Sequence, residues 1–191
     1  MRDPWLYRWM PLVVERAGDD PILELGCGSG DDSVTLVSRG LSLVGVDLSE
    51  QAIAKARRRV PAAQFCRRDL REPLPTLPSS TGVVLASLSL HYFSWSETVA
   101  LVHRMREVLR PGGLLLCRLS STTDHNYGAS GYVAIEENYY SVNGESKRFF
   151  DKPAIEKLFQ EGWRTLSIEE KITHKYSMPK ALWEVALEKA A

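Results

Sequence analysis

Glycines and acids near the start of the chain are the residues whose types and spacing best suit chemistry. Gly26, Gly28 and Gly30 follow the short run 22–25 directly, and Asp47 ends the next apolar run. Because glycine has no Cβ, its backbone can approach a ligand that a side chain would block. A carboxylate at the end of a neighbouring strand can accept hydrogen bonds from ribose hydroxyls. The pattern predicts a site for a nucleoside-containing cofactor.

The spacing of these glycines distinguishes two cofactor classes. A dinucleotide-binding loop, G-x-G-x-x-G, that began at Gly26 would need its third glycine at position 31. This chain has Asp31 there. The spacing therefore argues against an NAD-linked oxidoreductase, which stays a disfavoured alternative.

The stretches around the loop predict the fold that positions it. Short apolar runs alternate with stretches of helical periodicity, which favours an α/β fold with a doubly wound, mainly parallel sheet and helices on both faces. We expect Pro111, Gly112 and Gly113 to end a helix and turn into the next strand. Expected strands are 22–25, 42–46, 64–66, 83–87 and 114–119, and expected helices are 5–16, 33–39, 49–59 and 97–109.

The last third of the chain differs in character. Residues 120–150 have little apolar periodicity and many Tyr, Asn, Gly and Ser residues. A loop of this length inside a small domain is usually functional, so we expect a variable, substrate-side insert that could act as a lid. A short helix at 153–160 and strands at 163–171 and 181–188 follow. We expect one domain over 1–191, with 1–18 as an N-terminal helix or flap.

Residues 20 to 119 resemble the class I S-adenosylmethionine (SAM) dependent methyltransferases. The resemblance rests on the glycine loop, on Asp47, on the segment Arg68-Asp69-Leu70 and on the turn at 109–114. It implies SAM as the cofactor and S-adenosylhomocysteine as its product. It also implies a seven-stranded sheet whose last strand is antiparallel.

The resemblance further implies a role for residues along the cofactor. Most of them lie just after strand ends, where an open α/β sheet binds its ligands. In chain order they are Glu24 (amino group), Gly26, Cys27, Gly28 and Gly30 (methionine end), Asp47 (ribose), Leu48 (adenine), Asp69 and Leu70 (adenine amino group) and Ser87 (meeting point of cofactor and acceptor).

Candidates for the acceptor side follow the fourth and fifth strands. A SAM-dependent enzyme must bring a nucleophile in line with the methyl group, and a general base is optional. His91 and His125 are candidates for a base or a substrate contact, with a hydrogen-bonded wall residue as the alternative. Further substrate-side candidates are Tyr92, Arg118, Tyr127, Tyr139 and Tyr140. Trp5, Tyr7 and Trp9 could form a flap over the cofactor or pack on the sheet.

Composition narrows the classes of partner. Lys plus Arg and Asp plus Glu number 24 each, so the net charge is zero and strong nonspecific attraction to nucleic acid is not expected. The chain has no apolar run of about 20 residues and no signal-peptide pattern, so we expect no membrane span and a cytoplasmic location.

Cys27, Cys66 and Cys117 are too far apart for a zinc knuckle or a disulfide framework, and no metal is expected. Cys27 is expected to be a packing residue rather than a nucleophile.

These observations together favour methyl transfer from SAM to an O, N or S atom of a small-molecule acceptor. A protein or RNA methyltransferase and a non-catalytic SAM-binding domain are the alternatives. The chain has Leu88-Ser89-Leu90-His91 where an Asn/Asp-Pro-Pro-Tyr motif would follow the fourth strand. This argues against amino-methylation by that motif. The acceptor and the oligomeric state are left open.

Overall fold

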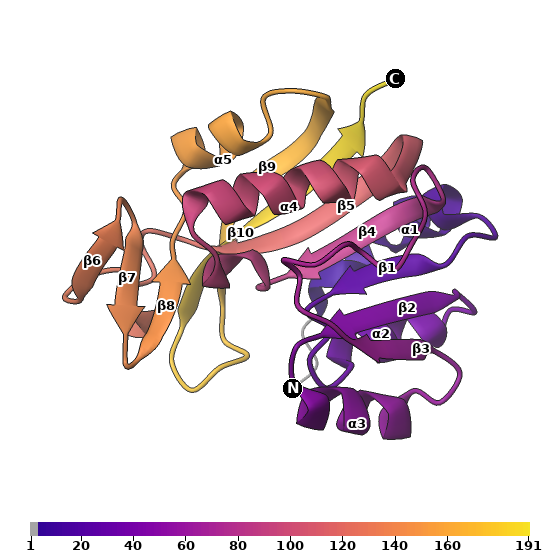
Figure 1. Ribbon diagram of the computed structural model, residues 1–191, viewed down its shortest axis with the longest axis horizontal. Coiled ribbons are helices and arrows are strands. Elements are labelled where there is room, and N and C mark those ends of the chain that lie inside the picture. Colours follow the sequence, from indigo (N-terminus) through magenta and orange to yellow (C-terminus); the bar gives the residue numbers. More distant parts are fainter. Residues whose placement is uncertain (1–3) are drawn as a thin grey trace.

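The computed structural model describes residues 4–191, which form two β-sheets (Figure 1). The larger sheet has the strand order β3-β2-β1-β4-β5-β10-β9. Its strands are β1 (Ile22–Leu25), β2 (Leu43–Asp47), β3 (Gln64–Arg67), β4 (Thr81–Ser87), β5 (Leu109–Ser120), β9 (Trp163–Thr173) and β10 (Lys180–Lys189). Strands β1 to β5 pair in parallel, whereas β10 is antiparallel to both β5 and β9. The predicted seven-stranded sheet with an antiparallel last strand is confirmed.

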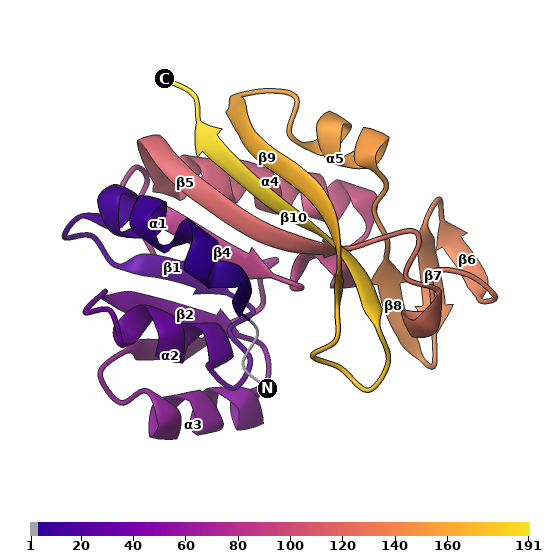
Figure 2. The ribbon, with the colours of Figure 1, turned by 180° about the vertical axis from the view of Figure 1, so that it is seen from behind.

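Helices cover both faces of this sheet (Figures 1 and 2). One face carries η1 (Pro4–Trp9), α1 (Met10–Ala17), α2 (Asp31–Val37) and α3 (Glu50–Arg59), and the other carries α4 (Trp95–Val108) and α5 (Lys152–Leu158). Successive side chains of a strand point to opposite faces. Accordingly, Val83 and Leu85 of β4 pack with the first group of helices, and Val84 and Ala86 with the second. None of the helices in residues 4–191 is long and apolar enough to cross a membrane.

Serine caps fix the start of two helices beside the sheet edge. The Ser49 hydroxyl accepts a hydrogen bond from the Ala52 amide at 3.2 Å, which starts α3 where the sequence predicts it. Ser94 and Glu97 form a capping box, each side chain accepting from the other residue's amide. Because of this box α4 begins at Trp95, two positions before the expected start at 97.

The segment 111–113 does not have the predicted conformation. It was expected to end a helix and turn into a strand, but it lies inside β5 (Leu109–Ser120). The pairing of β4 with β5 shifts register between Thr81 and Val83, opposite this segment. Gly112 has a φ of 73°, which glycine adopts without strain. The segment is therefore an irregularity within a strand.

Residues 120–150 also differ from the expectation of a loop without regular structure. They contain η3 (His125–Tyr127) and a small antiparallel sheet of β6 (Val133–Glu136), β7 (Tyr139–Val142) and β8 (Glu145–Arg148). Asn143 and Gly144 connect β7 to β8 with φ values of 52° and 85°. Positive φ at both central residues is the geometry of a tight hairpin turn, which explains why a sequence poor in apolar residues forms strands here.

The small sheet lies beside the large one (Figure 1). Phe150, two residues after β8, joins the two. The Phe150 amide donates to the Ser120 carbonyl at 2.8 Å, and its carbonyl accepts from the Trp183 indole at 2.9 Å. Its side chain is fully buried in the cluster beneath α4 and α5. Phe150 thus ends the insert inside the main core.

Replacing Phe150 with Ala should therefore destabilise the whole chain. Loss of a fully buried phenylalanine leaves a cavity and costs about 3–5 kcal/mol of unfolding free energy. Tyr132→Ala is the matched control, because this insert residue is 40% exposed, and it should change stability by less than about 0.5 kcal/mol. Denaturant unfolding of both variants checks the prediction. Equal midpoints would contradict the anchoring of the insert in the main core.

Candidate cofactor and acceptor site

A cavity of about 420 Å³ opens at the edge of the large sheet where the parallel strands end. Three parts of the chain line it: the loop after β1 with the start of α2, the segment after β4, and the end of β5 with η3 and the β9–β10 turn. The lining residues include Glu24, Gly26, Cys27, Gly28, Asp31 and Asp32 from the first part, Ser87, Leu88, His91 and Tyr92 from the second, and Arg118, Tyr127, Lys175, Tyr176 and Lys180 from the third.

The glycine loop is shaped by two different requirements. Gly26 has a φ of 69°, and a Cβ there would lie 2.4 Å from the Ser89 Cβ. Gly28 also has a positive φ, of 54°, but a Cβ there would meet no described atom within 4 Å. Gly26 thus allows close packing against the segment after β4, while Gly28 leaves open space beside the cavity. Between them Cys27 is buried, and this burial raises the pKa of its thiol.

Asp47 ties this loop to the end of β2. One carboxylate oxygen accepts from the Gly28 amide at 2.8 Å, and the other accepts from the Ser49 amide at 2.8 Å. Hydrogen bonds to an ionised acceptor are stronger than neutral ones. The bonds fix the carboxylate between the glycine loop and the N-cap of α3.

Glu24 lies at the floor of the cavity and is almost fully buried. Its carboxyl accepts a hydrogen bond from the Ser33 hydroxyl at 2.5 Å. Burial, followed by the nearby charge of Asp32, raises the pKa of Glu24 to about 8. The group is therefore largely protonated at neutral pH and would ionise if a cation came to lie beside it.

The expected adenine-side residues lie past the ends of β2 and β3. Leu48 is 57% exposed, and Leu70 is buried. The Asp69 carboxylate accepts from the Arg71 amide at 2.8 Å and pairs with its guanidinium at 3.3 Å. These contacts hold the Asp69 carboxylate at a fixed place on this side of the sheet edge.

On the opposite side of the cavity lies η2 (Leu90–Tyr92), which carries His91 and Tyr92. Their rings are 4.1 Å apart. Burial, then the charges of Lys180 and Lys147, lowers the pKa of His91 to about 3, so its imidazole is neutral at physiological pH. Burial likewise raises the pKa of the Tyr92 phenol, which stays protonated.

The wall beyond η2 carries cationic and aromatic side chains. Arg118 is buried, donates from Nε to the Ser87 hydroxyl at 2.8 Å and stacks on the Trp5 ring at 4.5 Å. Lys180 pairs with buried Asp124 at 2.7 Å. Its ammonium also lies 4.5 Å from the centre of the Tyr127 ring. This wall faces the glycine loop across the cavity.

Sequence reasoning missed Lys175 and Tyr176 of the β9–β10 turn and Lys180 at the start of β10. The signal was present, because an antiparallel last strand must begin at the edge where the parallel strands end. Lys175 pairs with Asp31 at the start of α2 at 3.2 Å and so joins two parts of the cavity lining.

Eight sequence candidates lie outside the lining of the cavity. Of residues 4–191, the acceptor-side candidates His125, Tyr139 and Tyr140 do not line it, and neither do the cofactor-side candidates Gly30, Asp47, Leu48, Asp69 and Leu70. His125 is exposed, with Nδ1 3.1 Å from the Ser130 hydroxyl, and Tyr140 packs on Phe149 in the small sheet. No group of three or more His, Cys, Asp or Glu side chains suited to a metal ion occurs in this same range.

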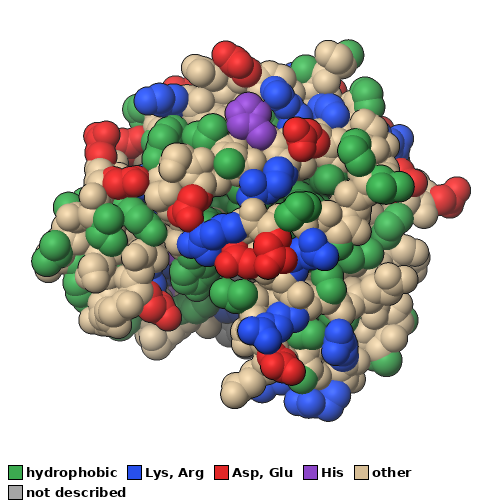
Figure 3. Space-filling view, in the orientation of Figure 1, with side chains coloured by type: hydrophobic (Ala, Val, Ile, Leu, Met, Phe, Trp, Pro, Cys, Tyr) green, Lys and Arg blue, Asp and Glu red, His purple; other side chains and the backbone are tan. Residues whose placement is uncertain are grey.

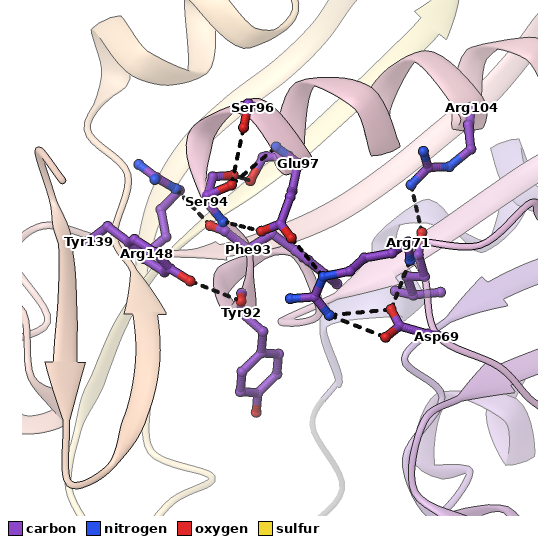
Figure 4. A network of polar contacts seen from close by, with 12 residues as sticks. Asp69, Arg71, Tyr92, Phe93, Ser94, Ser96, Glu97, Arg104, Tyr139 and Arg148 are labelled. Carbon is purple, nitrogen blue, oxygen red and sulfur yellow. Dashed lines mark hydrogen bonds and ion pairs between the residues drawn. The ribbon is translucent and has the colours of Figure 1, made fainter. Parts of the chain in front are cut away.

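A polar network holds η2 in place (Figure 4). From the small sheet, Arg148 Nε donates to the Phe93 carbonyl at 3.0 Å, and the Tyr139 hydroxyl donates to the Tyr92 carbonyl at 3.3 Å. Arg148 also pairs with Glu136, whose carboxylate accepts from the Trp95 amide at 3.0 Å. The Tyr92 side chain points away from these contacts. The small sheet thus fixes the backbone that presents His91 and Tyr92 to the cavity.

On the other side of η2 the network continues toward the adenine-side acid. Arg71 pairs with Glu97 of the capping box at 2.7 Å and with Asp69 at 3.3 Å (Figure 4). The start of α4 therefore connects the two ends of the candidate site.

Comparison with known proteins agrees with this geometry. Residues 22–113 match the family described as a methyltransferase domain. An uncharacterized methyltransferase of Synechocystis sp. (strain PCC 6803) is 32% identical over 110 residues, 56% of this chain and 51% of that protein. A trans-aconitate 2-methyltransferase of Acidovorax sp. (strain JS42) is 31% identical over 105 residues, 54% of this chain and 39% of that protein. The chain spans about half the length or less of these curated relatives.

The fold is shared over nearly the whole chain. A SAM-dependent methyltransferase from Methanosarcina mazei has a TM-score of 0.80 at 19% identity, covering 94% of this chain and 97% of that one. The fold is that of the class I SAM-dependent methyltransferases. The resemblance seen in the sequence is thereby confirmed, over the residues 22–113 that match a methyltransferase-domain family.

Arg148→Met should loosen the small sheet. The change leaves the Glu136 carboxylate and two backbone carbonyls without their charged donor. We expect hydrogen exchange of the β6–β8 amides to accelerate at least tenfold, with amides of β1 and β4 unchanged. Lys147→Met, on the same strand and half-buried, is the control and should leave exchange near wild type. Unaltered exchange in Arg148→Met would contradict the anchoring role.

Glu24 should make stability depend on pH. Its pKa is about 8 when folded and near 4.5 when unfolded, so between these values the folded state holds a proton that the unfolded state lacks. The unfolding free energy of the chain should therefore fall as pH rises from 4.5 to 8, by at most about 1.4 kcal/mol per unit from this group. In Glu24→Gln this contribution should disappear. Parallel pH profiles for the two proteins in denaturant titrations would contradict the buried, protonated state.

Proposed function

We infer that the chain binds SAM at the glycine loop and transfers its methyl group to a small-molecule acceptor in the cavity. The observation that carries this function is the bonding of Asp47 to the Gly28 amide at the edge of the acid-lined cavity. It combines a backbone open to a ligand with a carboxylate at the end of the adjacent strand. Such an arrangement suits a nucleoside with a cationic side chain.

The residues present fit SAM at both ends. Because Gly28 has no side chain, the space beside its backbone is open to a ligand. Glu24 is placed to ionise beside the cofactor's amino group. At the other end the Asp47 carboxylate would accept hydrogen bonds from the ribose hydroxyls, and Leu48 would cover the adenine ring. The Asp69 carboxylate would accept a hydrogen bond from the amino group of the adenine. SAM supplies an electrophilic methyl group. The remaining proposed contacts of the cofactor are Gly26, Cys27, Gly30, Leu70 and Ser87.

On the acceptor side the chain's own residues would act by positioning. His91 is neutral and poorly suited to take a proton, so we assign it a hydrogen bond to the acceptor rather than the role of base. Tyr92, Arg118 and Tyr127 would line the acceptor's place. Holding the nucleophile in line with the methyl group can supply up to about 7–11 kcal/mol of the barrier reduction.

Two observations support a small acceptor over a macromolecule. A cavity of about 420 Å³ has room for a small organic molecule, and lysine and arginine alternate with acids on the face in Figure 3. A relative named for methylation of trans-aconitate agrees with this assignment. A nucleic-acid substrate would instead favour a continuous basic surface.

The N-terminal segment would cover the glycine loop from outside. Trp5 is buried, and its indole donates to Asp32 at 3.1 Å while its ring stacks on Arg118. These contacts support the flap expected for residues 1–18, of which residues 1–3 lie outside the described range. We also keep the proposal of one domain over the chain.

Asp47→Ala should weaken SAM binding at least tenfold in calorimetry. The variant loses charge-assisted bonds to the ribose and the tether of the Gly28 amide, each of which contributes roughly 1.5–3 kcal/mol. Glu156→Ala, on α5, is the control and should bind SAM like wild type. Wild-type affinity in Asp47→Ala would refute the ribose role, and no binding of SAM to the wild-type chain would refute the proposed function.

A further inference from the structure

We propose that the methyl acceptor is a carboxylate, bound against the wall formed by Lys180, Tyr127 and His91, and that one of its oxygens becomes a methyl ester. This proposal rests on the proposed function and adds the chemical class of the acceptor.

The first observation is that charges of opposite sign line opposite sides of the cavity. The lining acids, Glu24, Asp31 and Asp32, come from β1 and the first turn of α2, where a cationic cofactor would lie. The lining residues contributed by β5, η3 and the β9–β10 turn include cations and tyrosines, but no acid. An anion would be attracted to this second side, and an amine in its protonated form would be repelled from it.

Lys180 is the most specific feature of that wall. It lies at the start of β10, is largely buried, and pairs with Asp124, whose second carboxylate oxygen accepts from the Ala181 amide at 3.1 Å. An ammonium has three donors. Within residues 4–191 Asp124 is the only hydrogen-bond acceptor that Lys180 reaches, while Tyr127 offers its ring face. Two N–H groups of Lys180 are therefore available to a ligand.

His91 provides a second and independent observation. Its side chain lines the cavity with 9% of its surface exposed, and its Nδ1 has no hydrogen-bond partner among the described residues. A buried polar atom without a partner is costly unless a ligand satisfies it. In the tautomer with a proton on Nδ1, the neutral ring would donate to a carboxylate oxygen held by Lys180.

The chemistry of a carboxylate suits a site without an effective base. An alcohol or an ammonium acceptor must lose a proton, yet His91 has a depressed pKa and Tyr92 holds its proton at neutral pH. A carboxylate arrives ionised. Its oxygen lone pair forms the bond to the methyl carbon while the carbon–sulfur bond breaks, and sulfur keeps that electron pair. The products are a neutral methyl ester and the thioether, with no proton released.

The first test measures binding of carboxylates against their uncharged isosteres. The chain is saturated with S-adenosylhomocysteine and titrated in a calorimeter with succinate, citrate, benzoate and 3-phenylpropionate, and with the amide of each. We expect at least one carboxylate to bind ten times or more tightly than its amide. If the amides bind equally well, or if no carboxylate of this set binds to the saturated chain, the proposal is overturned.

The variants remove the ammonium without leaving a buried charge unpaired. Lys180→Met alone would leave the buried Asp124 carboxylate without its ion-pair partner. The double variant Lys180→Met/Asp124→Asn is therefore measured beside it. The double variant should lose at least tenfold in carboxylate affinity and keep its SAM affinity within about threefold. Lys152→Met, an exposed change of equal charge on α5, should behave like wild type. Carboxylate affinity that survives in the double variant would overturn the role of Lys180.

The product provides the last readout. Incubation with methyl-labelled SAM and the tightest-binding carboxylate should yield a labelled product. Because a methyl ester hydrolyses in mild base, the label should then be released as methanol. A base-stable label would overturn esterification. Failure of the proposed function is distinguishable, because the wild-type chain would then show no SAM binding in the same calorimeter before any carboxylate is added.

Discussion

The convergence of strand ends at one edge of the sheet is the constraint on which this site depends. Strands β1 to β5 run parallel, so the residues after each of them emerge on the same side. Strand β10 runs the other way and starts at that edge, which brings Lys180 opposite the glycine loop. One topological fact thus assembles a cofactor loop and an acceptor wall from segments far apart in sequence.

Burial gives these groups their chemical character. Glu24 and His91 are both largely buried beside the cavity, and in both cases desolvation is the main cause of the pKa shift. Before a cofactor binds, Glu24 is therefore protonated and the His91 imidazole is neutral. Such a site has little capacity for proton transfer, and it favours catalysis by placement and by charge.

The sequence predicted the secondary structure correctly where a local pattern of residues is compatible with only one kind of element. Alternating apolar runs predicted the parallel sheet, and the helix expected at 49–59 is α3 (Glu50–Arg59). The insert at 120–150 was misjudged because each of its three strands is only four residues long, although Asn143-Gly144 is a recognised hairpin signal. Burial of His91 and the pairing of Lys180 with Asp124 depend on contacts between distant segments. No local pattern in the sequence reveals such contacts.

The central claim is that the glycine loop and Glu24 receive the cationic methionine end of SAM. Calorimetric titration of SAM at pH 7, in two buffers of different ionisation enthalpy, measures both the binding and the protons exchanged. We expect one SAM per chain and release of nearly one proton, as Glu24 ionises beside the cofactor's amino group. Binding of SAM without proton release, or no binding at all, would contradict it.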